Sequence, residues 1–421
     1  MAAKYEAFPG MEDLLPGEVE KWQWIEEKAR IFFESRGYKE IRTPLLEPTE
    51  LFARSIGDAS DIVHKEMYTF NDRGERSMTL RPEQTASVAR SVIEHGLLKT
   101  AKSLRLYYMG PMFRAERPQA GRKRQFHQIG IEIINEAGTG ADFESVSLLY
   151  HFLMYAGLAK PELRLNDLSE IRQHPEVADK LRNYFSKEKT KLCPDCHYRL
   201  EKNVLRIFDC KVESCQPVIR KAPWEEIAPL SADFKKLTEQ LEAHKIPFEV
   251  KRRLVRGLDY YTGSVFEVAA SGLGAQDAVA GGGRYDRLYS ELGGTPTPCT
   301  GFSLGVERLL TALGKDDLAV KMRTRRVYLA PLESTCEALK VAAEKALSLR
   351  EQGIRVETTP GETSLSRHLK KANQAGIRYV MILGADEIQK KKWIVKDMDE
   401  KKQSEIDMKE IDAYLQGVLA L

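Results

Sequence analysis

One stretch of the chain, LYYMGPMFRAERPQAGRKRQFHQIGIEII (residues 106–134), restricts the fold more than any other, because two strand-like runs flank a basic loop. This pattern predicts a long antiparallel hairpin. Along the second run side chains alternate between faces, so that Gln128, Gly130 and Glu132 share one face and three isoleucines share the other. We therefore expect one face of the strand to be core and the other to offer an amide, a bare backbone and a carboxylate.

The loop of this hairpin has two interpretations. Arg114 ends the first run, and Arg117, Arg122, Lys123 and Arg124 follow in the loop. Such cations suit phosphate oxygens, as in a nucleotide or the end of a nucleic acid. Alternatively, the hairpin is an exposed sheet edge that its charge keeps soluble.

The rest of the chain divides into regions. Its 421 residues exceed what one hydrophobic core usually holds, so we expect several domains. Residues 1 to about 322 alternate helices and strands irregularly, and 168–246 within them is predicted to be a helical insert. After the basic linker KMRTRR, strand and helix patterns alternate, which predicts a small α/β domain with a largely parallel sheet.

Composition narrows the class of protein. No apolar run approaches the ~20 residues that span a bilayer, and the N-terminal residues lack the apolar region of a secretory signal. Six cysteines are few for this length, so we expect free thiols and a cytoplasmic location. The net charge of +3 does not exclude a nucleic-acid partner, because local patches matter more than totals.

The stretch LVRGLDYYTGSVFEV gathers Arg256, Asp259, Tyr260 and Tyr261 at the start of an apolar strand pattern. These side chains are costly to bury. We interpret them as part of a pocket that holds a small polar molecule.

A second candidate binding segment is TLRPEQTASVAR, in which a helix pattern begins after a turn. Glu83 can bind an ammonium group, and the Thr85 hydroxyl can donate a hydrogen bond. The alternative is that Glu83 caps the helix and interacts with its dipole.

Two further stretches carry glycines. In AVAGGGRYDRLYSELGG the three glycines match neither a P-loop nor GxGxxG, and they either let a ligand approach a strand backbone or form a tight turn. In TGFSLGVERLL a strand leads into a helix with Arg308 in its first turn. A cation opposes the helix dipole there, which indicates an anionic partner unless Arg308 is an ordinary surface residue.

Four of the six cysteines lie within the predicted insert. Cys193 and Cys196 form a CPDC pair, and Cys210 and Cys215 follow. The spacing resembles a small zinc knuckle, for which His197 is a further candidate ligand. The alternative is four reduced, buried thiols, and we expect no catalytic role for them.

Together and in this order, the motifs resemble those of class II aminoacyl-tRNA synthetases, and of the histidyl-tRNA synthetase family in particular. IRTPLLEPTELFARSIGD, with Pro44, resembles motif 1, the 106–134 hairpin resembles motif 2, and GFSLGVERLL resembles motif 3. RGLDYYTGSVFEV and AGGGRYDRL resemble the two histidine-specific motifs. The resemblance covers essentially the whole chain.

The resemblance implies a fold and an activity. The fold is an α+β catalytic core with a mixed, mostly antiparallel sheet (1–322), a helical insertion within it (168–246) and a C-terminal α/β anticodon-binding domain (323–421). The activity is ATP-dependent ligation of L-histidine to its cognate tRNA through a histidyl-adenylate. Mg²⁺ would arrive with ATP, and motif 1 implies a homodimer.

The resemblance also implies roles for individual residues. Those implied for histidine binding are Glu83, Thr85, Gln128, Glu132, Tyr260, Tyr261 and Tyr285. Arg114 would bind the α-phosphate of ATP, Arg308 the γ-phosphate end, and Arg256 both the histidine carboxylate and the transferring phosphate. Arg117 and Gln119 would lie near the tRNA acceptor end.

Two other functions fit parts of the pattern. A non-catalytic, synthetase-like subunit that senses histidine and regulates a biosynthetic enzyme would use the same pocket, but such paralogues usually lack the third domain and lose motif arginines. A pure RNA-binding module leaves the pocket unexplained. The joint presence of the pocket, Arg114, Arg256, Arg308 and the third region favours the ligase.

Overall fold

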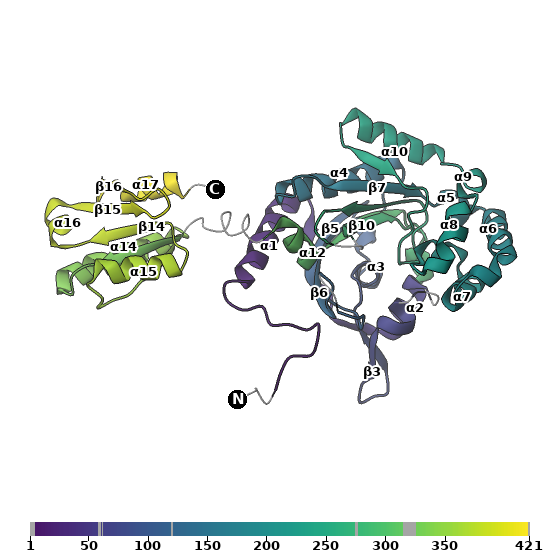
Figure 1. Ribbon diagram of the computed structural model, residues 1–421, viewed down its shortest axis with the longest axis horizontal. Coiled ribbons are helices and arrows are strands. Elements are labelled where there is room, and N and C mark those ends of the chain that lie inside the picture. The colour runs from purple at the N-terminus through teal and green to yellow at the C-terminus, as the bar shows by residue number, and fades with distance from the viewer. Residues whose placement is uncertain are drawn as a thin grey trace. The chain divides into compact units, whose positions relative to one another are not determined.

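The computed structural model describes residues 5–57, 60, 62–118, 121–273, 277–314 and 326–419. The chain forms two compact units, Met1–Gly314 and Lys315–Leu421, which Figure 1 colours from purple to green and from green to yellow. Among the described residues, no helix combines the length and the apolar character that crossing a membrane requires.

The first unit is built on an eight-stranded sheet. In spatial order the strands are β1 (Lys39–Glu40), β5 (Leu104–Phe113), β6 (Gln125–Ile134), β11 (Cys299–Gly305), β10 (Ala278–Arg284), β9 (Ser264–Ala269), β7 (Glu162–Asp167) and β8 (Phe248–Val250). Only the outer pairs β1–β5 and β7–β8 are parallel, and the inner pairs are antiparallel. The predicted mixed, mostly antiparallel sheet is therefore confirmed.

Strands β5 and β6 form the predicted hairpin. Gly130 lies opposite Tyr108, and Glu132 lies opposite Leu106. Because β6 also pairs with β11 along its length, the hairpin is internal to the sheet. The alternative of an exposed edge hairpin is wrong.

One face of this sheet is the apolar core. Ile129, Ile131 and Ile133 are fully buried there. Helices α1 (Val19–Glu34) and α4 (Thr139–Tyr155) cover this face, and Phe33 of α1 contacts both Phe152 of α4 and Phe302 of β11. The polar face is consequently on the other side of the sheet.

The polar face is bordered by elements that follow one another early in the chain. They are β2 (Leu46–Pro48), α2 (Thr49–Ile56), the short helix η1 (Ile62–Glu66), β3 (Tyr68–Asn71), β4 (Ser77–Leu80) and α3 (Thr85–Glu94). Strands β2, β4 and β3 form a small antiparallel sheet. Helix α12 (Val306–Leu313) begins directly where β11 ends.

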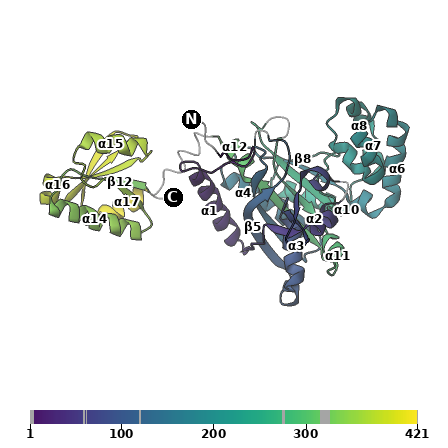
Figure 2. The ribbon, with the colours of Figure 1, turned by 90° about the horizontal axis from the view of Figure 1, so that it is seen from below.

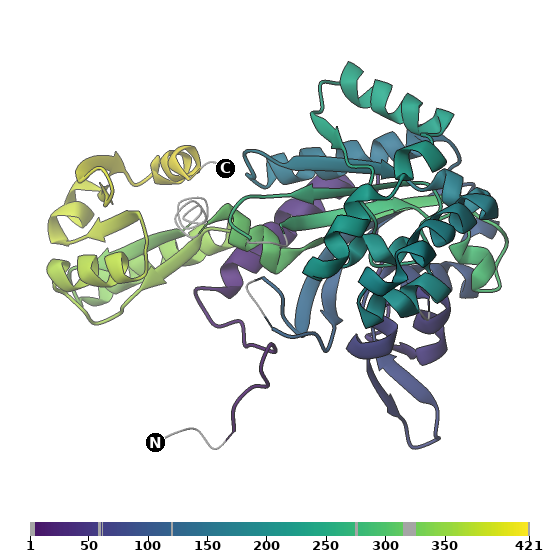
Figure 3. The ribbon, with the colours of Figure 1, turned by 45° about the vertical axis from the view of Figure 1, so that its right-hand side comes forward.

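Residues 169–243 are helical. They form α5 (Ser169–Gln173), α6 (Pro175–Lys187), α7 (Pro194–Lys202), α8 (Gln216–Lys221), α9 (Trp224–Ile227), α10 (Ala232–Ala243) and the 3-10 turns η3 (Lys189–Lys191), η4 (Val204–Asp209) and η5 (Glu213–Cys215). In Figures 2 and 3 the teal helices α6 to α8 gather beside the sheet, whereas α10 runs along α4. The limits of the insertion, 168–246, stay a prediction.

The second unit has a five-stranded sheet in the order β13 (Arg355–Thr358), β12 (Arg326–Pro331), β14 (Tyr379–Leu383), β15 (Lys392–Asp397) and β16 (Lys402–Asp407). Its helices are α14 (Cys336–Glu351), α15 (Leu365–Gln374), α16 (Ala385–Lys390) and α17 (Ile411–Val418). Strands β13, β12 and β14 are parallel, but β14–β15 and β15–β16 are antiparallel. The expectation of a largely parallel sheet is wrong, because only two of the four strand pairs are parallel. No sequence pattern indicated β16, whose residues are mostly exposed and lack apolar alternation.

Candidate active site

A pocket opens on the polar face of the eight-stranded sheet. Its lining comes from β6, β10, β11, the start of α12, the hairpin loop, the 256–261 loop and the turn before α3. The predicted binding residues among those lining it are Glu83, Arg114, Gln128, Arg256, Tyr260, Tyr261 and Arg308. Segments that are more than 200 residues apart in the chain therefore contribute to one site.

Glycines make the room for this site. A Cβ atom at Gly301 would collide with the carboxylate of Glu132, and one at Gly130 would collide with the Tyr108 hydroxyl. At Gly281 it would collide with the guanidinium of Arg256. Long polar side chains can therefore lie flat across the strands, which is the close approach that glycine in a strand permits.

Of the two predictions for the glycines of AVAGGGRYDRL, the tight turn is wrong. The other prediction, that a ligand approaches the strand backbone, stays a prediction, and Gly281 does line the pocket. The structure shows extended strand β10, and the space above Gly281 and Gly283 holds Arg256 and Tyr261. These glycines admit the binding residues themselves.

Three arginines from separate elements surround the pocket. Arg114 donates from Nε to the Pro82 carbonyl at 3.0 Å, and Arg308 donates from Nε to the Ala278 carbonyl at 2.6 Å. Arg256 donates from Nη1 to Glu267 at 3.4 Å, while its buried Nε has no acceptor among the described residues. Burial lowers the pKa of both Arg114 and Arg308. Such a cost of burying cations is offset when an anion binds.

The charges that line the pocket also favour an anion. Five cations line it, Arg114, Arg122, Lys123, Arg256 and Arg308, and three carboxylates, Glu83, Glu116 and Glu307. The pocket is therefore suited to an anionic ligand such as a nucleoside triphosphate.

Glu83 combines two predicted behaviours. Its carboxylate accepts hydrogen bonds from the backbone N–H groups of Thr85 (2.7 Å) and Ala86 (2.9 Å), as the helix-capping interpretation requires. The same side chain lines the pocket and is only 3% exposed. Burial raises its pKa, so a ligand ammonium group would favour its charged form.

Below the pocket lies a cluster of buried hydroxyls around Glu132. Thr85 donates to Glu132 at 2.7 Å, and Tyr285 donates to its other oxygen. Burial raises the pKa of Glu132 to about 8. Thr85, Glu132 and Tyr285 are not among the residues that line the pocket, so they lie behind it in this structure.

Tyr108 is a member of this cluster that the sequence did not indicate. Its ring lies over Gly130. Its hydroxyl hydrogen bond to the Glu132 carboxyl lowers the pKa of that group and so offsets part of the rise that burial causes. The only available signal is the pairing of Tyr108 with Gly130 across the hairpin, which requires the register of the strands to be known.

The three predicted tyrosines pack together. The ring centroid of Tyr260 lies 4.8 Å from that of Tyr261 and 5.6 Å from that of Tyr285. Gln128 lies nearby on the pocket wall, and its buried side-chain oxygen accepts no hydrogen bond from the described residues. An unsatisfied buried amide group of this kind is expected where a ligand or a water completes its hydrogen bonds.

Asp259 does not join the pocket, contrary to the grouping that the sequence suggested. Its carboxylate accepts from Asn203 at 2.8 Å and from Arg206 at 2.9 Å, both in the helical region 169–243. The 256–261 loop therefore faces in two directions, with Arg256, Tyr260 and Tyr261 toward the pocket.

Only some of the basic residues of the hairpin loop line the pocket. Arg122 and Lys123 line the pocket, and they also pair with Glu116 and Glu12. Arg124 donates instead to the Glu116 carbonyl at 3.3 Å. Arg117 is exposed on the loop, and the predicted tRNA contact Gln119 lies outside the described residues.

The four cysteines of the insert converge, as the knuckle prediction requires. Their sulfur atoms all lie within 4.8 Å of one another, and those of Cys193 and Cys210 are 3.8 Å apart. Zn–S bonds of ~2.3 Å in a tetrahedron place sulfurs about 3.8 Å apart, so the set fits zinc. His197 is not part of this group and contacts the Lys189 carbonyl at 2.8 Å.

A mostly antiparallel sheet whose polar face carries three arginines beside a small polar pocket is what the motifs predicted for a class II aminoacyl-tRNA synthetase. Comparison with known families agrees with this assignment. The sequence model of the family described as histidyl-tRNA synthetase matches residues 10–191 and 210–309, and that of the anticodon binding domain matches 326–417. The chain belongs to the histidyl-tRNA synthetase family.

Individual relatives agree. The histidine–tRNA ligase of Anaeromyxobacter dehalogenans is 42% identical over 419 residues, which cover 98% of this chain and all of the relative. The crystal structure of apo S. aureus histidyl-tRNA synthetase has a TM-score of 0.74 at 30% identity and covers 98% of this chain. A Bacillus halodurans protein titled ATP phosphoribosyltransferase regulatory subunit/histidyl-tRNA synthetase shares the fold, with a TM-score of 0.64 at 24% identity and 91% of this chain covered.

Proposed function

We propose that this chain attaches L-histidine to its cognate tRNA in two steps, through a histidyl-adenylate. The observation that carries this proposal is the pocket itself, which combines Gln128, Glu83 and the tyrosines with three arginines. A site that only sensed histidine would have no need for cations beyond the amino acid carboxylate.

In the first step, a carboxylate oxygen of histidine attacks the α-phosphorus of ATP. A bond forms between that oxygen and phosphorus, the bond from phosphorus to the bridging oxygen breaks, and pyrophosphate leaves. The work of the protein is to position two anions and to neutralise charge in the transition state. Arg256 and Arg114 do this at the α-phosphate, and Arg308 holds the γ-phosphate end.

Mg²⁺ bound to ATP supplies further neutralisation of the phosphates. In the second step a ribose hydroxyl of the tRNA attacks the activated carbonyl, an ester bond forms, and AMP and a proton leave. No nucleophilic side chain is required for either step.

Selection of histidine would rest on polar groups of the pocket wall and of the hydroxyl cluster that lies behind it. Glu83 and Thr85 would hold the amino group, Gln128 would face the carboxylate, and Glu132 and Tyr261 would face the imidazole. When ionised, the Glu132 carboxylate has about four lone-pair sites, and the hydrogen bonds from Thr85, Tyr285 and Tyr108 leave one for a ring N–H. A ligand without two ring nitrogens would leave buried groups unpaired, which can reject analogues by ~10⁴-fold.

The decisive experiment is ATP–pyrophosphate exchange with each of the twenty amino acids, run with and without tRNA. We expect exchange with histidine alone, and transfer of histidine to tRNA when tRNA is present. Histidine binding to folded protein without exchange would contradict this proposal and would favour the regulatory-subunit function.

The other partners follow from the same proposal. The C-terminal unit would read the anticodon, and Arg117 and Gln119 would meet the acceptor end. The segment of motif 1 would form a homodimer interface, a role that suits the exposed Leu45 (41%) and Phe70 (45%) beside the small sheet. Light scattering of the purified chain tests this, and a monomer at micromolar concentration would exclude a stable dimer.

We further propose that Cys193, Cys196, Cys210 and Cys215 hold a structural Zn²⁺. The support is the convergence of four sulfurs at distances that fit a tetrahedral site. Bound metal would join the two ends of a short, irregular segment. Metal analysis of protein purified under reducing conditions tests this, with one zinc per chain expected.

A further inference from the structure

The segment between the two cysteine pairs touches the 256–261 loop directly. Asn203 donates to the Asp259 carboxylate at 2.8 Å. Arg206 donates from Nε to the same carboxylate oxygen at 2.9 Å and from Nη2 to the Gly257 carbonyl at 2.7 Å. The Arg206 residue is only 7% exposed, so these bonds are shielded from water and correspondingly strong.

The two anchored residues of the loop alternate with residues of the pocket. Gly257 follows Arg256, and Asp259 precedes Tyr260 and Tyr261. Apolar packing adds to the hydrogen bonds, because Ile207 and Phe208 of η4 belong to the same buried cluster as Val255, Tyr260 and Tyr261. Movement of η4 would therefore shift the loop that positions Arg256 and both tyrosines.

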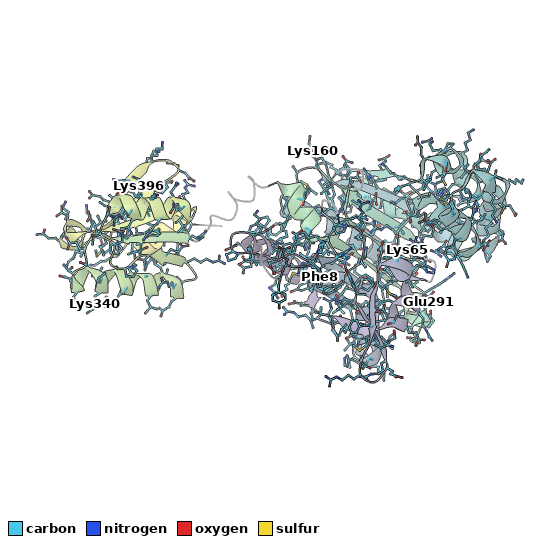
Figure 4. All side chains as sticks on the ribbon, turned by 60° about the horizontal axis from the view of Figure 1, so that its bottom comes forward. Phe8, Lys65, Lys160, Glu291, Lys340 and Lys396 are labelled. Carbon is cyan, nitrogen blue, oxygen red and sulfur yellow. The ribbon has the colours of Figure 1, made fainter. Side chains whose placement is uncertain are left out.

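A second contact leads from the same segment toward Arg114. The Tyr198 hydroxyl of α7 lies 2.7 Å from Nε2 of His64, and Oδ1 of Asp195 lies 3.8 Å from Nζ of Lys65. Lys65 is labelled in Figure 4. Both partners belong to η1, and the backbone carbonyl of its last residue, Glu66, accepts a hydrogen bond from the Ala115 N–H at 2.7 Å. The segment thus supports the pocket from two sides.

The thiol cluster lies at both ends of this segment, whose middle is held by apolar packing and by the bonds of Asn203 and Arg206. Helix α7 has nine residues and η4 has six, lengths at which helices are marginal without tertiary support. Cys193 and Cys196 lie at the start of α7, and Cys210 follows η4 directly. A metal that joins these sulfurs would fix both ends of the stretch that carries Asn203 and Arg206.

We propose that zinc bound by the four cysteines fixes the position of the 256–261 loop. Asn203 and Arg206 are the positioning residues, because their hydrogen bonds connect the metal-bound segment to that loop. The inference rests on the proposed histidine ligase activity and on the proposed zinc site. The family model matches residues 10–191 and resumes at 210. Residues 192–209, which carry the first cysteine pair, Asn203 and Arg206, lie between the two matched stretches.

The test compares wild type, C210S, R206A, the double variant and C336S in the full-length protein. Cys336 is an exposed thiol of the C-terminal unit, so C336S is the matched control. For each protein, zinc content, the KM for histidine and kcat are measured, together with hydrogen exchange of the amides in residues 254–262.

We expect C210S to lose zinc, to raise the KM for histidine at least tenfold and to speed exchange of the 254–262 amides. R206A should keep its zinc and show the same kinetic and exchange changes. The double variant should be no worse than the more severe single variant, since both act through one contact. C336S should match wild type throughout.

Some outcomes would overturn the inference. They are loss of zinc in C210S with an unchanged KM and unchanged exchange, or additive effects of C210S and R206A. If C210S does not fold, zinc is removed from wild type with a chelator and restored, and protection of residues 254–262 must fall and recover with it. Absence of zinc from wild type would overturn the metal site and the inference built on it but not the ligase, whereas absence of ATP–pyrophosphate exchange from zinc-loaded protein would overturn the ligase.

Discussion

The eight-stranded sheet and the five-stranded C-terminal sheet differ most in what their faces bury. On the large sheet one face is apolar, whereas the other holds Glu83, Gln128 and Glu132 at 8% exposure or less. In the C-terminal unit, apolar clusters cover both faces of the sheet. His368 is the single buried polar or charged residue among those described there, and hydrogen bonds to Tyr328, Pro331 and Glu362 satisfy it.

The contrast separates two reasons for burying a residue. Apolar residues on the C-terminal sheet stabilise the fold, so their loss should reduce stability and leave the first chemical step intact. Polar residues on the large sheet cost free energy to bury, and we propose that a ligand offsets this cost by completing their interactions. Their loss should reduce activity more than stability.

Replacement of Arg256 tests the contrast most strongly. R256A should lower histidine-dependent ATP–pyrophosphate exchange by roughly 10³-fold or more, about 4 kcal/mol, because a charge at the transferring phosphate disappears. The free energy of unfolding should change little, because among the described residues the ion pair of Arg256 is a long one, 3.4 Å to Glu267. Pre-steady-state and steady-state exchange measure the activity.

R256K serves as its control. A lysine keeps the charge but loses the planar fork, so it should recover part of the activity only. Equal activity of R256A and wild type would remove Arg256 from the reaction.

Replacement of Gly281 tests whether activity requires the space that this glycine leaves for the Arg256 side chain. The added Cβ of G281A would displace the Arg256 guanidinium. We expect exchange to fall by roughly 10²-fold, in line with the cost of small misplacements at a reacting centre. G140A in α4 is the matched control, because a Cβ at Gly140 meets nothing within 4 Å. Full activity of G281A would show that Arg256 can act from another position.

Truncation of a core side chain in the C-terminal sheet should reduce stability and leave ATP–pyrophosphate exchange almost unchanged. L329A deletes a fully buried side chain of β12, and such truncations cost about 2–5 kcal/mol. Hydrogen exchange of residues 326–419 should show that loss, while ATP–pyrophosphate exchange stays within about twofold. L347A, at a position that is 58% exposed, should change stability by no more than about 0.5 kcal/mol. A large loss of ATP–pyrophosphate exchange in L329A would remove the distinction between the two sheets.

The sequence predicted those features that follow from local periodicity. The 106–134 hairpin and the alternation of Gln128, Gly130 and Glu132 with the isoleucines require only a period of two. The features that it missed depend on which strands become neighbours. Tyr108 reaches Glu132 because it lies across from Gly130, and β16 pairs with β15 although its own residues are exposed.

In one place, residues that are adjacent in the sequence were wrongly predicted to share a site. Arg256, Asp259, Tyr260 and Tyr261 seemed to form one polar group, but successive side chains of a loop can face different partners. Asp259 is bound by Asn203 and Arg206, more than 50 residues earlier in the chain. No local pattern marks a contact of that kind, because it depends on how the helical segment folds back onto the loop.

The last test of the contrast is the pH dependence that Glu132 gives to the large sheet, an effect that is small within any one pH unit. Burial raises its pKa to about 8, above the value of about 4.3 expected in the unfolded chain. Between these values the folded protein retains a proton that the unfolded chain releases. The contribution of Glu132 to stability is therefore fully present below pH ~4.3 and is lost as the pH rises toward 8.

E132Q removes this titration and keeps the shape of the side chain. The stability of wild type relative to E132Q should fall by up to about 1.4 kcal/mol per pH unit between pH 5 and 8. Unfolding of both ligand-free proteins at pH 5.5, 7.0 and 8.5 measures the difference, in which the raised pKa of Glu83 cancels because both proteins contain it. Parallel curves would mean that Glu132 has an ordinary pKa, and hence that the hydroxyls of Thr85, Tyr108 and Tyr285 solvate its charge as well as water does.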